Sequence, residues 1–175
     1  NGAHYIDLTG EIPFVRQMID AYDGRAQQAG VKVVQVCGFE ALPADLAVLL
    51  AIETARERWG EDLAEADLEA SVEGPPGMPR PSDMISGGTF QSLAAAAGGE
   101  DASAVTDPGA LIADPAVAGE VRRRSPITLA PRRSGDAVIA PMAPAAFINP
   151  AVIHRTAALV GSEPSRMNAT CALPS

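Results

Sequence analysis

The sequence is poor in cysteine, aromatic residues and long apolar runs. Cys37 and Cys171 are its only cysteines and lie far apart, which argues against a disulfide framework or a zinc knuckle. Aromatic residues make up 4% of the chain, so we expect a core of alanine and aliphatic side chains with few rings. No run approaches the roughly 18 apolar residues of a membrane helix, and no signal-peptide pattern opens the chain. We therefore predict a soluble, cytoplasmic protein without a transmembrane segment.

Basic residues are also scarce. Lys and Arg number 13 against 22 Asp and Glu, which gives a net charge of -9. The longest basic cluster is the arginine triplet at residues 122–124. Because nucleic acids are bound by basic surfaces, we expect no nucleic-acid partner. A hydrophobic content of 47% is enough for a folded core and argues against a disordered chain.

The first sixty residues show a strand-helix-strand-helix pattern. HYIDL at residues 4–8 is β-prone, and apolar residues at helical spacing then predict a helix from Pro13 to residue 29, ended by Gly30. The β-branched run at residues 31–36 predicts a strand buried on both faces of a parallel sheet. A second helix is expected from Pro43 to about Arg58.

The composition changes near residue 74. Pro13 and Pro43 are the only prolines before Pro75, and the other thirteen of the fifteen follow. Here we expect less regular elements. They are a strand at 68–72, a loop at 75–81, a short helix at 94–97, a strand at 137–139, and a helix at 148–160 with Pro150 near its first turn.

Two loops follow the predicted parallel strands, where open α/β sheets bind ligands. The first is Thr9-Gly10-Glu11, which can contact a ligand or form a plain turn with Glu11 beside the helix N-terminus. The second begins Cys37-Gly38-Phe39 and continues to Glu40, Pro43 and Asp45. Glu40 and Asp45 suit general acid-base chemistry or a purely electrostatic role at a helix start.

Cys37 at a strand end suggests a nucleophile, but that chemistry needs a nearby base. His4 and His154 are the only histidines, and nothing in the sequence brings either one to Cys37. A buried cysteine without reactivity is the simpler interpretation.

Two further features have weak chemical signals. Ser86-Gly87-Gly88-Thr89 can hold a phosphate or polar substrate at a helix N-terminus, or serve as a glycine hinge. Seven acidic residues lack calcium-loop spacing and indicate a solvated surface; they are Glu57, Glu61, Asp62, Glu65, Asp67, Glu69 and Glu73. Neither a GxGxxG fingerprint nor a Walker motif occurs, so the residues alone indicate part of an α/β protein.

Three consecutive segments of the sequence allow a more specific prediction. They read HYIDLTGE, PFVRQMIDAYDGRAQQAG and VKVVQVCGFEALPADLAVLL. Together they resemble the saccharopine dehydrogenase-like oxidoreductases, including trans-acting enoyl reductases, which typically read HYVDLTGE, a helix, and CGFDSIPSDLG. The resemblance is close over residues 3–50 and weaker at 86–89 and 140–161.

The resemblance implies an α/β fold class. Residues 1–60 would be the C-terminal part of a Rossmann-type parallel sheet, with the glycine-rich nucleotide loop upstream of Asn1. Residues 61–175 would be part of an α+β domain for substrate and dimer contacts. The implied activity is hydride transfer from NADPH or NADH to an enoyl (lipid or polyketide) or imine-type substrate, small or carrier-bound, without a metal. A homodimer is the implied assembly.

The resemblance also implies roles for individual residues. The nicotinamide end of the cofactor would be bordered by Thr9, Gly10, Glu11, Cys37, Gly38 and Phe39, and the substrate side by Pro43, Asp45, Ser86, Gly87, Gly88 and Thr89. Three positions depart from the family pattern: Glu40 replaces aspartate, and Ala41 and Ala44 replace serines. The tail at residues 162–175 matches nothing in the family. A non-catalytic α/β binding or assembly module is the alternative.

Overall fold

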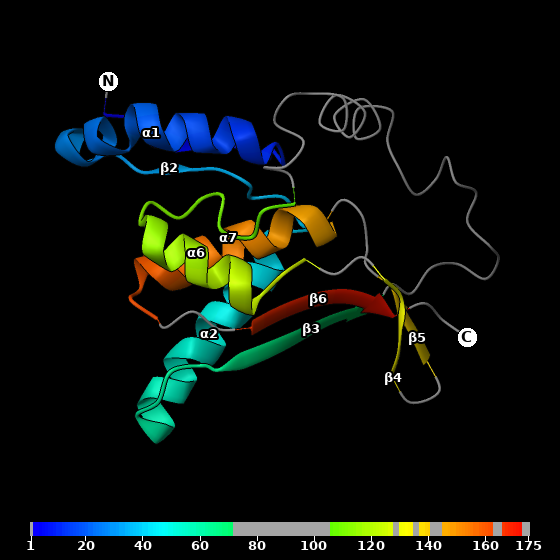
Figure 1. Ribbon diagram of the computed structural model, residues 1–175. Coiled ribbons are helices and arrows are strands. Elements are labelled where there is room, and N and C mark those ends of the chain that lie inside the picture. The colour runs from blue at the N-terminus through cyan, green and yellow to red at the C-terminus, as the bar shows by residue number, and fades with distance from the viewer. Residues whose placement is uncertain are drawn as a thin grey trace, which may run out of the picture.

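The computed structural model describes residues 2–71, 106–127, 130–134, 137–140, 145–162 and 166–172. These residues form a mixed α/β structure (Figure 1). In chain order the described elements are β1 (Tyr5–Ile6), α1 (Ile12–Ala29), β2 (Val33–Val34), α2 (Leu42–Trp59), β3 (Glu65–Ser71), α6 (Pro115–Arg124), β4 (Arg132–Ser134), β5 (Ala137–Ala140), α7 (Ala145–Leu159) and β6 (Arg166–Ala172). The predicted α/β character is confirmed.

The first unit is a parallel strand-helix-strand arrangement. β1 and β2 pair in parallel, with Tyr5 opposite Val33 and Ile6 opposite Val34. Helix α1 connects them and ends at Gly30, whose φ of 62° is left-handed. Glycine adopts this conformation without a steric penalty, so it ends the helix as predicted.

The prediction of a long strand at residues 31–36, buried on both faces, is wrong. Strand β2 contains only Val33 and Val34, and their exposed fractions are 44% and 43%. In the described part of the chain β2 pairs with β1 alone. A two-stranded sheet cannot cover both of its own faces, so these β-branched side chains stay in contact with solvent.

The second sheet has the strand order β3-β6-β5-β4. β3 runs parallel to β6 over seven residue pairs, whereas β5 is antiparallel to both of its neighbours. The strand predicted at 68–72 begins three residues earlier, at Glu65, and the one predicted at 137–139 extends to Ala140. Strands β4 and β6 and helix α6 were not predicted from the sequence. The tail at 162–175 thus supplies a strand that pairs with β3.

Helix α7 lies between the first sheet and the second (Figure 1). It contributes to three clusters of buried or partly buried apolar side chains, which join it to α1, α2, α6 and β6. The helix predicted at 148–160 begins earlier, at Ala145, so Pro150 lies inside it rather than in its first turn. Burial of nine of its fifteen residues explains how α7 tolerates an internal proline.

The core of the described residues follows the composition. Its buried apolar side chains are Ile, Val, Leu, Ala and Met, with no aromatic ring among them, as predicted. One cluster joins Ile12 and Val15 of α1 to Leu111 and to Ile148 of α7.

The domain boundary at residue 60 remains a prediction. The loop at 75–81, the helix at 94–97 and the Ser86–Thr89 segment lie outside the described residues. Within the described parts, every helix is too short or too polar to cross a bilayer.

Candidate functional site

Asp7 joins the two loops that follow the parallel strands. Its backbone carbonyl accepts a hydrogen bond from the Cys37 amide at 2.9 Å. Its carboxylate accepts from the Thr9 amide at 3.1 Å, the Val36 amide at 3.4 Å and the Gln35 side-chain amide at 3.5 Å. The loops that the sequence analysis selected therefore lie side by side. Asp7 was not among the residues predicted from the sequence, although an Asp two residues before Thr-Gly is typical of a side-chain-stabilised turn.

Val36 has an unusual backbone conformation at this junction. Its φ is 61° although it is β-branched, and its side chain is 4% exposed. A left-handed backbone at such a residue costs about 1–2 kcal/mol. The hydrogen bonds of Asp7 to Val36 and Cys37 hold the chain in this conformation, and they direct it from β2 into the Cys37 loop.

The first loop packs tightly against α7. The Thr9 hydroxyl accepts a hydrogen bond from the Glu11 amide at 3.5 Å, and Glu11 is the residue that precedes α1. Gly10 faces Ile148 so closely that a β-carbon at Gly10 would lie 2.6 Å from the Ile148 Cδ1 atom. Glycine at residue 10 therefore allows the loop to contact α7.

The second loop presents different groups to solvent. The Cys37 thiol is half-buried and free. Gly38 is buried, and its carbonyl accepts hydrogen bonds from the Ala41 and Leu42 amides at the start of α2. The Glu40 carboxylate folds back over Gly38, whereas the Phe39 ring is 91% exposed. An exposed ring beside two glycine-containing turns offers a stacking surface for a flat ligand.

Asn149 of α7 is a site residue that sequence reasoning missed. Its side chain is 4% exposed, and its Nδ2 donates to the Glu40 carbonyl at 2.8 Å. The only signal in the sequence was a polar residue before Pro150 in an apolar stretch. Since Ile148 meets Gly10, one turn of α7 contacts both loops. It fixes their relative position.

Asp45, a predicted substrate-side residue, is tied to α7. It lies in the first turn of α2, and its Oδ2 accepts a hydrogen bond from the Thr156 hydroxyl at 2.9 Å. Burial raises the pKa of the Asp45 carboxyl, and the Thr156 hydrogen bond opposes that shift. Pro43 is exposed within the first turn of the same helix. The substrate-side roles of Asp45 and Pro43 remain predictions.

Neither histidine is hydrogen-bonded to Cys37 in the described parts of the chain. His4 uses its Nδ1 to accept a hydrogen bond from the Lys32 amide at 3.0 Å, and His154 is 2% exposed inside α7. Burial lowers the pKa of His154 to about 4. In the same parts of the chain, no three metal-ligating side chains gather in one place, so the acidic stretch forms no metal cluster there.

Comparison with known proteins finds relatives for part of the chain. No protein-family model matches the chain, and no solved structure is detectably similar to it. The chain is similar to trans-acting enoyl reductases over 38% of its length. The protein of that name from Mycobacterium ulcerans is 42% identical over 67 residues, and that from Mycobacterium tuberculosis is 37% identical over 67 residues. A second Mycobacterium tuberculosis protein, which carries the name provisionally, is 39% identical over 66 residues.

The similarity covers only a small part of these relatives. The matched residues make up 16% of the length of each of them. Of the predicted resemblance to saccharopine dehydrogenase-like oxidoreductases, the part that concerns trans-acting enoyl reductases is therefore confirmed, over 38% of the chain.

Proposed function

We propose that this chain supplies one side of the nicotinamide site of a saccharopine dehydrogenase-like reductase, with a Rossmann-type sheet. The observation that carries the proposal is the similarity to trans-acting enoyl reductases, supported by the pairing of two strand-end loops through Asp7. In open parallel sheets, ligands bind at this edge. The reaction is hydride transfer from NADPH or NADH to an enoyl lipid or polyketide, or to an imine-type substrate.

The chemistry of the loops fits a nicotinamide ring. Gly10 and Gly38 keep the two loops compact, because the Ile148 side chain and the Glu40 carboxylate occupy the space that a β-carbon would need at these residues. Phe39 presents an open ring face of the kind that stacks on a flat heterocycle. A bound nicotinamide cofactor would supply the hydride. The described residues would hold and orient its ring, with Thr9, Glu11 and Cys37 at the border.

The residues of this chain would act by positioning. Asp7 fixes the two loops relative to each other, and Asn149 holds the Glu40 carbonyl at the start of α2. A preorganised edge of this type orients the reacting carbon. We further propose a cytoplasmic enzyme that acts on small or carrier-bound acyl substrates. Its second domain, from residue 61, would contribute Ser86, Gly87, Gly88 and Thr89 on the substrate side and a homodimer contact.

The test uses the full-length gene product and follows NADPH and NADH oxidation with enoyl thioesters and imines. Gly38→Ala places a methyl group where the Glu40 carboxylate lies, within 2.6 Å of an oxygen. We expect it to raise KM for the cofactor with little change in KM for the acyl substrate. Gly24→Ala is the matched control, because a β-carbon at Gly24 meets nothing within 4 Å. Absence of oxidation with every enoyl and imine substrate, together with absence of cofactor binding, would refute the proposal.

The second candidate is a non-catalytic α/β binding or assembly module. The alanines at residues 41 and 44 favour it, because the resembling family has serines there. The DNA upstream of the codon for Asn1 discriminates between the two. An in-frame GxGxxG supports the reductase, and a start codon immediately before Asn1 supports the module.

A further inference from the structure

A groove of about 450 Å³ lies between α1, β2 and α7. Its size falls within the range of about 300–1,000 Å³ that is typical of small-molecule sites. Apolar side chains form most of its walls, with Val15, Met18 and Ile19 contributed by α1 and Val152 by α7. A ligand in this groove would therefore bury an apolar part against aliphatic side chains.

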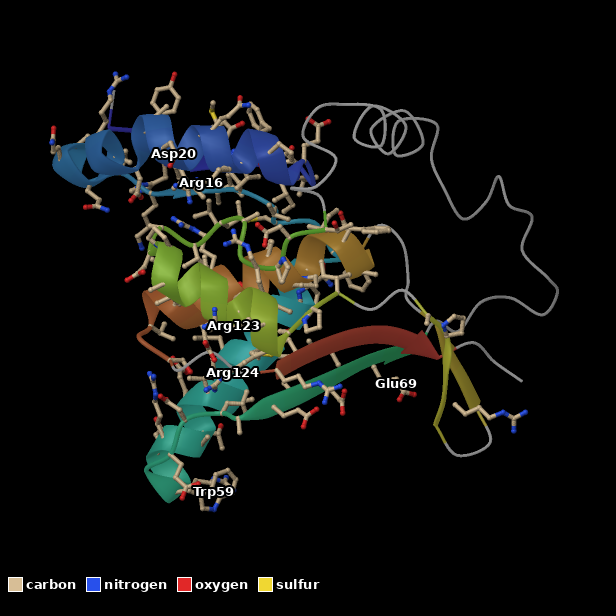
Figure 2. All side chains as sticks on the ribbon, viewed as in Figure 1. Arg16, Asp20, Trp59, Glu69, Arg123 and Arg124 are labelled. Carbon is tan, nitrogen blue, oxygen red and sulfur yellow. The ribbon has the colours of Figure 1, made fainter. Side chains whose placement is uncertain are left out.

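Arg155 of α7 lines the same groove. It is half-buried, and its Nη1 donates to the Leu111 carbonyl at 2.9 Å. Within the described ranges no carboxylate lies within ion-pair distance of Arg155. The other half-buried arginines differ, because Arg16 pairs with Asp20 and Arg56 with Asp62. Figure 2 shows Arg16 and Asp20 together on α1.

A half-buried guanidinium without an anionic partner is unfavourable, since burial removes part of its hydration. Desolvation lowers the pKa of the Arg155 guanidinium, because burial disfavours its charged form. The chain as a whole carries a net charge of -9, so carboxylates are abundant elsewhere. None of the carboxylates in the described part of the chain pairs with Arg155, which leaves its remaining donors available to a ligand.

The other charged groups of the groove are already engaged or are cationic. Asp23 accepts a hydrogen bond from the Gln27 side chain at 3.0 Å, and Asp45 accepts one from Thr156. Lys32 adds a second positive charge to the groove. The charges of Asp23 and Asp20 favour the charged form of Arg155 and that of Arg16 disfavours it, so the two aspartates would weaken anion binding without blocking it.

We propose that this groove binds an amphipathic anion, with an aliphatic chain against α1 and α7 and a carboxylate or phosphate head group on Arg155. The charge complementarity at Arg155 and the apolar walls are its basis. The proposal does not depend on the reductase assignment, because the groove is formed entirely by described residues of this chain.

Calorimetry on the 175-residue chain tests the proposal with decanoate, decyl phosphate and the neutral 1-decanol. We expect both anions to bind at least about tenfold more tightly than the alcohol, because charge-assisted hydrogen bonds to a guanidinium are the strong ones. The anion that binds more tightly identifies the preferred head group. Equal binding of the anions and the alcohol would overturn the proposal.

Variants locate the head group. Arg155→Met keeps the apolar stem and removes the charge, so it should reduce decanoate affinity about tenfold and leave decanol binding unchanged. Asp23→Asn should strengthen decanoate binding, because Asp23 lines the groove and acts more strongly on Arg155 than the other aspartate, Asp20. Arg58→Met, on the exposed last turn of α2, is the charge-matched control and should have no effect. Unchanged decanoate binding in a folded Arg155→Met chain would contradict the assignment.

Loss of the bond to Leu111 can unfold the Arg155→Met variant, so one measurement uses the unaltered chain. Decanoate should shift the backbone amide resonances of Leu111, Val152 and Arg155 in a two-dimensional NMR spectrum. Shifts confined instead to the exposed apolar residues Ile6 and Leu8 would overturn the proposal. Arg155→Lys retains a charge and should keep most of the affinity.

Discussion

Single side chains connect segments of this chain that lie far apart in sequence. Asp7 joins the loops after β1 and β2, and Asn149 reaches the Glu40 carbonyl across more than a hundred residues. Such partly buried polar contacts form only in one arrangement of the elements, so they specify the geometry as well as stabilise it. The residues that position the candidate site are therefore different from those that would touch a ligand.

His154 makes the stability of the fold depend on pH. Burial lowers its pKa from the ordinary 6.5 to about 4. Above pH 6.5 the imidazole is neutral in both states and has no effect. As the pH falls from 6.5 to 4, the unfolded chain takes up a proton that the folded chain does not, so the free energy of unfolding decreases, by about 3 kcal/mol in total.

Urea unfolding of the unaltered chain and of His154→Leu at pH 7 and pH 4 measures this effect. The difference in stability between the two proteins should change by about 3 kcal/mol in favour of the variant at pH 4. His4→Gln, a change at an exposed histidine, serves as the control. Parallel loss of stability in the unaltered chain and in His154→Leu would show that His154 is not the group responsible.

Gly109 is required where the segment after Thr106 passes over α6. A β-carbon at Gly109 would lie 2.8 Å from the Ala118 carbonyl oxygen, and backbone cannot move aside as a side chain can. We expect Gly109→Ala to destabilise the fold by about 1–3 kcal/mol. Gly24→Ala, inside α1 and with no atom within 4 Å, should instead stabilise by about 0.5–1 kcal/mol. Thermal unfolding of both variants measures the contrast, and equal melting temperatures would contradict it.

At the scale of elements, Arg56 joins the ends of two helices. Its Nη1 and Nη2 donate to the Val160 and Gly161 carbonyls at 2.9 and 2.8 Å, and its Nε donates to Asp62 at 2.6 Å. The carbonyls follow the last turn of α7, where a cation also interacts favourably with the helix dipole. Arg56 thus holds the C-terminal ends of α2 and α7 together.

We expect Arg56→Met to destabilise the fold by about 1–3 kcal/mol, because two carbonyls and Asp62 lose a donor. Arg56→Lys should recover only part of this, since an ammonium cannot reproduce the planar fork of the guanidinium. Arg58→Met, two residues further along α2, is the control and should change stability little. Chemical denaturation of the three variants measures the differences, and full recovery by lysine would contradict the role of the fork.

The sequence predicted helices better than strands, for a local reason. Helix α1 was expected from Pro13 to residue 29 and occupies Ile12–Ala29, because its apolar period and its terminal Gly30 are both encoded locally. Strand β6 was not predicted, because its pairing with β3 joins Glu65 to Arg166 across a hundred residues. Its sequence, RMNATCA, has little alternation or β-branching to indicate a strand.

The candidate site was likewise predicted from the sequence only where its signals are local. The two loops were predicted because each follows a local strand signal, and the structure brings them together. The contacts of Ile148, Asn149 and Thr156 with these loops and with α2 were not predicted, since α7 reaches them only through tertiary packing. The buried state predicted for β2 was also wrong, because burial depends on how many elements cover a strand.

At the scale of the whole molecule, the first sheet has exposed apolar residues at both strands. Tyr5, Ile6 and Leu8 are 52%, 68% and 70% exposed, alongside Val33 and Val34. Parallel sheets are usually covered on both faces, and the relatives are much longer than the part that matches this chain. Under the proposed function, these surfaces belong to a larger sheet whose other strands hold the adenosine and pyrophosphate parts of the cofactor.

This division of the cofactor site predicts how the 175-residue chain binds nucleotides. Backbone amides of a glycine-rich loop at a helix N-terminus normally bind the pyrophosphate, and GxGxxG does not occur in this chain. The chain should therefore bind NADPH very weakly, and nicotinamide mononucleotide about as weakly, because only the nicotinamide end would meet residues such as Phe39. The full-length protein should instead bind NADPH much more tightly than nicotinamide mononucleotide. Calorimetry with both ligands on both proteins measures this, and micromolar binding of NADPH to the 175 residues alone would contradict it.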